Sequence, residues 1–61
     1  MSNREAKELA FLRHRLREHL LAQDASGAAE PLLRLNEVAA GDQELRAEYA
    51  RWAFRFELLA A

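Results

Sequence analysis

The two histidines are the first residues to examine for chemistry, because histidine serves both as a metal ligand and as a general base. His14 and His19 lie five positions apart. On one helix this places them ~140° apart, so they cannot bind the same metal ion. His14 and Glu18 lie one turn apart and supply at most two ligands, whereas a protein metal site uses three or four. The sequence therefore predicts no metal site.

The other candidate catalytic groups also lack the arrangement that catalysis needs. Neither serine lies in a nucleophile motif, and the two glycines are too far apart to form a phosphate-binding loop. Glu44 and Glu48 are a pair of carboxylates one helical turn apart. Nothing in the sequence predicts the burial that would tune their pKa values, so we expect them on a solvated face. We predict a protein that is not an enzyme, with no cofactor and no small-molecule substrate.

The basic segment 13–17 raises the alternative of nucleic-acid binding. Clustered arginines neutralise phosphates, and Arg13, Arg15 and Arg17 are the candidate contacts. On a helix, however, Arg15 points away from Arg13 and Arg17, and several glutamates are interspersed. The formal net charge of the chain is −1. Nucleic-acid binding by a dimeric regulator is therefore our second hypothesis rather than the first.

The segment 3–23 is predicted to be a long helix. Ser2 and Glu5 have the S-x-x-E spacing of a capping box, in which both side chains bind free backbone N–H groups. One apolar stripe follows, at spacings of three and four residues: Leu9, Leu12, Leu16 and Leu20. Turn-forming residues end this helix near Gln23.

A second, shorter helix is predicted over 28–40, with Pro31 in its first turn because proline deeper in a helix lacks a donor and clashes with a preceding carbonyl. Leu32, Leu35 and Ala39 share its apolar face. Gly41 suits a left-handed residue after this helix, and Asp42 suits the N-cap of the next. We therefore expect a sharp corner at positions 41–42.

A third helix is predicted over 43–59. Its apolar residues recur at alternating spacings of four and three, which is typical of a packed helical seam: Leu45, Tyr49, Trp52, Phe56 and Leu59. We expect this seam in the core, with the polar tips of Tyr49 and Trp52 at its edge. The 61 residues thus predict one all-α domain, 1–61, arranged as a helical hairpin of the two long helices or as a compact three-helix bundle.

Composition restricts where such a chain works. Without cysteine there is no disulfide, no apolar run approaches the ~18 residues of a membrane span, and the first residues are polar. We expect a cytoplasmic protein with no membrane partner. Arginine far outnumbers lysine, and alanine and leucine are abundant, a composition that suggests a bacterial or phage origin.

Several apolar residues fall outside the predicted core stripes. Phe11 and Leu21 lie on the far side of the first helix, near His14, and Ala50, Phe54 and Leu58 form a second stripe opposite the aromatic seam. Either the short helix covers these residues, or they form an interface, since exposed apolar patches mark interaction sites. A chain of this length buries only ~60% of its surface, which favours an interface. We therefore predict a homodimer or a small regulator, such as an inhibitor, an antitoxin-like factor or a co-chaperone, that binds a protein partner through these six residues.

Overall fold

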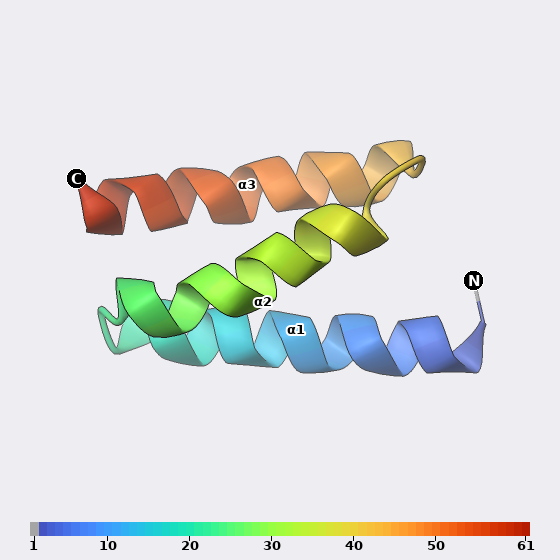
Figure 1. The fold of residues 1–61 in the computed structure, drawn as a ribbon, viewed down its shortest axis with the longest axis horizontal. Coiled ribbons are helices and arrows are strands. Elements are labelled where there is room, and N and C mark those ends of the chain that lie inside the picture. The colour runs from blue at the N-terminus through green and yellow to red at the C-terminus, as the bar shows by residue number, and fades with distance from the viewer. Residues whose placement is uncertain (1) are drawn as a thin grey trace.

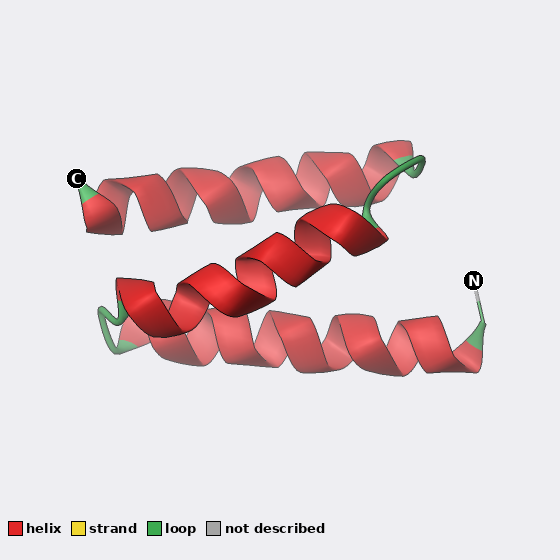
Figure 2. Ribbon diagram, viewed as in Figure 1, coloured by secondary structure: helices red, strands yellow, loops and turns green. Residues whose placement is uncertain are grey.

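Three helices joined by short turns form a three-helix bundle. The computed structural model describes residues 2–61, which contain α1 (Asn3–Leu21), α2 (Ala25–Val38) and α3 (Gln43–Ala60) and no strand (Figure 2). The predicted order of long, short and long helix is confirmed. Because α1 and α3 run in the same direction, with α2 crossing between them in the opposite direction (Figure 1), they do not form the hairpin that was the other predicted arrangement. No helix within residues 2–61 combines the length and apolar character needed to cross a membrane.

The ends of α1 are formed by local hydrogen bonds. The Ser2 hydroxyl accepts from the Glu5 backbone N–H at 3.2 Å, which is one of the two hydrogen bonds of the predicted capping box. At the other end Gln23 has a φ of 57°, in the left-handed region. The N–H groups of Gln23 and Asp24 donate to the Leu20 and His19 carbonyls at 3.1 and 2.8 Å, which is a Schellman motif. This motif ends α1 at Leu21, two residues before the predicted end.

The start of α2 differs from the prediction. Asp24 is its N-cap and accepts from the Gly27 N–H at 2.9 Å, so α2 begins at Ala25 and Pro31 lies in its second turn rather than its first. The cap adds a helical turn before Pro31, and there the proline ring is buried against the core. A Cβ at Gly27 would overlap the Asp24 carboxylate and the His19 ring, whose Oδ2 and Nδ1 atoms lie 3.1 Å apart, at hydrogen-bond distance. Glycine at this position therefore allows the close approach of the α1–α2 turn.

The predicted corner between the second and third helices is confirmed. Gly41 has a φ of +83°, in the left-handed region that glycine adopts without strain. The Asp42 carboxylate accepts from the Leu45 N–H at 3.1 Å and caps α3. These two residues turn the chain within the four residues, 39–42, that connect α2 to α3.

The buried core comes mainly from α1 and α2. It consists of eight apolar residues: Leu9, Leu12, Leu16, Ala28, Leu32, Leu35, Ala39 and Leu45. The predicted stripes of the first two helices are thus largely confirmed, with Leu20 half-buried at the end of its stripe. From α3 only Leu45 is buried. Tyr49, Trp52 and Phe56 are half-buried and pack against the core, and Leu59 is half-buried at the end of the seam. The expectation that the whole aromatic seam is core is wrong.

The diagonal course of α2 explains this difference. Figure 1 shows α2 passing from the C-terminal end of α1 to the N-terminal end of α3. It therefore covers the start of α3, where Leu45 is 8% exposed, and diverges from the C-terminal half, where Leu58 is 65% exposed. The C-terminal ends of α1 and α3 are left with an uncovered apolar surface.

Candidate functional site

An apolar groove lies between the C-terminal ends of α1 and α3. It encloses about 450 Å³, within the ~300–1,000 Å³ typical of ligand sites. Five large apolar side chains line it, two from α1 and three from α3: Leu20, Leu21, Trp52, Leu58 and Leu59. No residue of α2 lines the groove, because α2 has diverged from α3 at this end. We call this feature the α1/α3 groove.

The α1/α3 groove continues onto the outer side of α3. Leu58 lines the groove and also lies one turn after Phe54, which in turn follows Ala50 by one turn. All three are exposed, with Phe54 at 62%, and Leu21 on the opposite wall is 79% exposed. The short helix therefore does not cover the second stripe of α3. The groove and this stripe together form one exposed apolar surface.

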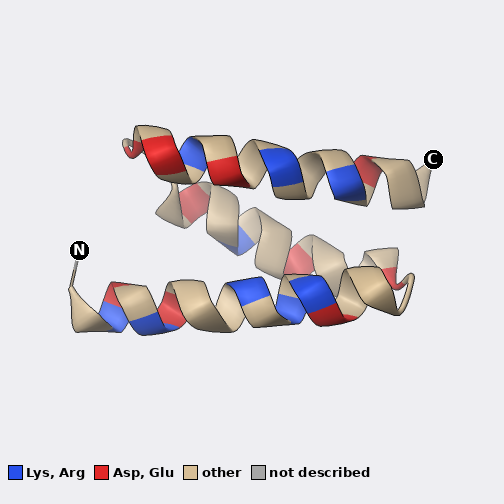
Figure 3. Ribbon diagram, turned by 180° about the vertical axis from the view of Figure 1, so that it is seen from behind, with Lys and Arg blue, Asp and Glu red and all other residues tan. Residues whose placement is uncertain are grey.

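Two arginines flank the apolar side chains of the groove. Arg17 comes from α1 and Arg55 from α3, and the Arg55 guanidinium carbon lies 5.2 Å from the centroid of the Trp52 ring. This is the geometry of a cation–π contact. Within residues 2–61 neither arginine lies within ion-pair distance of a carboxylate. Figure 3 shows that basic residues recur along α1 and α3, interspersed with acidic ones.

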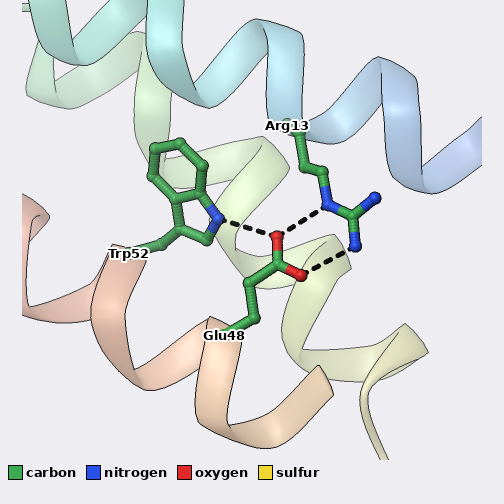
Figure 4. Close-up of polar contacts among 3 residues, drawn as sticks. All are labelled: Arg13, Glu48 and Trp52. Carbon is green, nitrogen blue, oxygen red and sulfur yellow. Dashed lines mark hydrogen bonds and ion pairs between the residues drawn. The ribbon is translucent and has the colours of Figure 1, made fainter. Parts of the chain in front are cut away.

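A polar network closes the inner end of this surface. Arg13 of α1 donates from Nε and Nη2 to the two Glu48 oxygens of α3, both at 2.7 Å. The indole Nε1 of Trp52 donates to the same carboxylate at 3.1 Å (Figure 4). The hydrogen bonds from Arg13 lower the pKa of Glu48, and the bond from Trp52 lowers it further against the opposing effect of burial. This network joins α1 to α3 and fixes the orientation of the Trp52 ring.

Sequence reasoning missed the role of Glu48. We expected Glu44 and Glu48 on a solvated face, but the Glu48 side chain is only 17% exposed and binds across the bundle. The available signal was position: Glu48 lies one turn before Trp52 and next to Tyr49, at the margin of the apolar seam. A carboxylate at such a margin reaches the neighbouring helix only if that helix presents a cation. The periodicity of a single helix does not show this.

A smaller depression lies on the other side of α1, against α2. Phe11 is 58% exposed there and Leu33 is 63% exposed. The Arg15 guanidinium lies over the Phe11 ring at 5.6 Å, and Arg34 forms two hydrogen bonds with Glu8, at 2.8 and 3.0 Å, at the rim. The charged groups of this depression are therefore largely paired with each other, unlike those of the groove.

The six predicted protein-binding residues are all exposed but do not form one surface. Leu21 and Leu58 line the α1/α3 groove, and Ala50 and Phe54 lie beside it on α3. Phe11 lies apart, in the depression against α2. His14 is exposed on α1, with Nε2 3.8 Å from an oxygen of Glu18, one turn later.

The three arginines of the nucleic-acid alternative also have separate positions. Arg13 is bound to Glu48, Arg15 lies over Phe11, and Arg17 flanks the groove. They do not present a single row of free cations. Within residues 2–61 no three metal-binding side chains of the His, Cys, Asp or Glu type come together.

Comparison with known proteins adds no further information on this site. No protein-family model matches the chain, and no curated protein or solved structure is significantly similar to it.

Proposed function

We propose that this chain is a small, non-enzymatic regulatory protein that binds a protein partner through the α1/α3 groove and the adjoining stripe of α3. One observation carries the proposal: apolar side chains from two helices converge on an open groove that the third helix leaves uncovered. Contiguous exposed apolar surface of this kind marks interaction sites. The partner is a second copy of the chain or another protein, in a bacterial or phage cytoplasm.

Paired substitutions test the proposal. Phe54→Glu and Leu58→Glu should leave helicity and the free energy of unfolding nearly unchanged, because both side chains are exposed. Each places a charge in an apolar contact and should abolish dimerisation or partner capture. Light scattering measures dimerisation, and affinity capture followed by mass spectrometry measures the binding of another protein.

A matched control is available on α2. Leu33 is as exposed as Leu58 but lies in the depression away from the groove, so Leu33→Glu should retain assembly and capture. If Leu33→Glu abolishes binding and Leu58→Glu does not, the binding surface is the depression between α1 and α2, and the proposal is wrong. If neither substitution changes assembly or partner capture, neither of these two apolar surfaces takes part in binding.

The alternative is a nucleic-acid-binding regulator. Arg17 supports it as an unpaired cation beside Arg55, but Arg13 is engaged with Glu48 and Arg15 with Phe11. A salt titration of binding to duplex DNA and to RNA tests this alternative, because phosphate contacts make affinity fall steeply with salt concentration. We expect no binding that survives ~0.2 M salt.

A further inference from the structure

The charges of the α1/α3 groove indicate what kind of partner it fits. Its lining includes Arg17 and Arg55 and no carboxylate. Neither guanidinium forms an ion pair inside the described chain, residues 2–61. An apolar groove with two uncompensated cations is complementary to a ligand that is both apolar and anionic.

Arg55 is held in a position that suits an anion. Its guanidinium group lies over the Trp52 ring, at 5.2 Å from the ring centroid. A stacked guanidinium still has N–H donors free at its edges, and less side-chain freedom is lost when they bind a carboxylate. Glu48 lies two turns before Arg55 on α3, and Arg13 already occupies both of its oxygens. The positive charge of Arg55 is therefore not compensated by a carboxylate within residues 2–61.

The open shape of the groove favours an extended partner over an enclosed small molecule. The groove merges through Leu58 with the exposed row that contains Phe54. An amphipathic helix places apolar side chains one turn apart along such a surface and has polar residues on either side of them. A small amphiphile would leave the exposed row of α3 uncovered.

We propose that the α1/α3 groove binds an acidic amphipathic helix of a partner protein. Two apolar side chains of that helix, one turn apart, insert between Leu20 and Leu59, against Trp52. Carboxylates that flank them pair with Arg17 and Arg55. This inference rests on the proposed function and adds the chemistry of the partner.

A peptide titration tests the inference, with Trp52 as the probe because it is the only tryptophan of the chain. One synthetic helical peptide of about 18 residues, or ~27 Å, carries leucines on one face and glutamates beside them. A matched peptide has lysine in place of every glutamate. We expect the acidic peptide to shift the Trp52 emission to saturation at low salt. The lysine peptide should bind at least about tenfold more weakly.

Charge reversal locates the contact. Arg17→Glu and Arg55→Glu should each weaken binding of the acidic peptide by about tenfold and strengthen binding of the lysine peptide. Arg46→Glu is the matched control, because Arg46 is exposed on α3 and does not line the groove. It should change neither affinity by more than about twofold. Circular dichroism of each variant confirms that the helices are retained, and the comparison of the two peptides on the unmodified chain needs no variant.

Each contrary result has a distinct meaning. Equal affinity for the two peptides would overturn the acidic partner and leave the groove as a docking surface. Binding of neither peptide would also overturn it, and the capture experiment with Leu58→Glu would then decide separately on the proposed function. If the chain alone forms a dimer that Leu58→Glu dissociates, the occupant is a second copy and the inference is wrong. Tighter binding of an RNA or DNA oligonucleotide than of the acidic peptide would overturn it as well.

Discussion

The two ends of the bundle differ in how completely their apolar side chains are covered. Where α2 meets the start of α3, Leu9, Leu35 and Leu45 are at most 8% exposed. At the other end, the C-terminal turns of α1 and α3 leave Leu21 and Leu58 mostly exposed, although the sequence there is equally apolar. Apolar content therefore does not separate core from surface in this chain. Core and surface are separated instead by the direction in which α2 crosses the two long helices.

The arginine–glutamate ion pairs follow the same division. Arg13 and Glu48 join α1 to α3, and Arg34 and Glu8 join α2 to α1, so these cations are used within the fold. At the open end Arg17 and Arg55 have no carboxylate partner within residues 2–61. The apolar and the charged groups of the α1/α3 groove are thus both uncovered, which is what the proposed partner site requires.

The largest effect is expected from truncation of the core. Leu16 is fully buried, so Leu16→Ala should lower the free energy of unfolding by about 2–5 kcal/mol. For so small a domain this is a large part of the total stability. Urea denaturation followed by circular dichroism measures it. Leu21→Ala is the matched control, because Leu21 is 79% exposed and its truncation should cost less than about 0.5 kcal/mol. Equal costs would mean that the open end is part of the core.

The next effect concerns the link between α1 and α3. Arg13→Ala removes two charge-assisted hydrogen bonds and leaves Glu48 half-buried, which should cost about 1–2 kcal/mol after allowance for partial exposure. Arg34→Ala removes a similar pair at a more exposed position and should cost less. A larger loss from Arg34→Ala in the same denaturation experiment would contradict this order.

The same link predicts a pH dependence. Because the pKa of Glu48 is lower in the folded chain than its ordinary value, its contribution is complete above about pH 4.3. The contribution is lost as the pH falls through the lower folded pKa. Glu48→Gln should therefore be less stable than the unmodified chain at neutral pH, and the difference should shrink on acidification. A difference that stays constant down to pH ~2 would show that the Glu48 charge is not involved.

A smaller effect is expected from substitutions at the two residues whose backbone lies in the left-handed region. Gln23 adopts a φ of 57° with a side chain, whereas Gly41 adopts +83° without one. Gln23→Gly should stabilise the fold by about 0.5–1 kcal/mol through relief of strain. Gly41→Ala should destabilise it by about 1 kcal/mol from backbone strain alone, since no atom lies within 4 Å of the added Cβ. A lower melting temperature for Gln23→Gly and a higher one for Gly41→Ala would contradict the assignment of both residues to the left-handed region.

The sequence was sufficient for the elements but not for their mutual coverage. The caps at Ser2 and Asp42, the corner at Gly41 and the core stripe of α1 follow from local rules and were predicted. The start of α2 was missed because Asp24 caps a turn that precedes Pro31. The half-exposure of Trp52 and the bond from Arg13 to Glu48 depend on the angle at which α2 crosses. That angle is a property of all three helices together, and no single periodic pattern contains it.

The difference between the covered and the open end of the bundle is tested most directly by the stability of Leu58→Glu. It is measured by urea denaturation at a concentration where the unmodified chain is monomeric. Leu58 lines the α1/α3 groove at 65% exposure, and a glutamate there would lie near Arg55, one turn before it. The free energy of unfolding should therefore stay within about 0.5 kcal/mol of the unmodified value. A loss of 2 kcal/mol or more, on the scale of a core substitution, would show that the groove belongs to the fold and is not a binding surface.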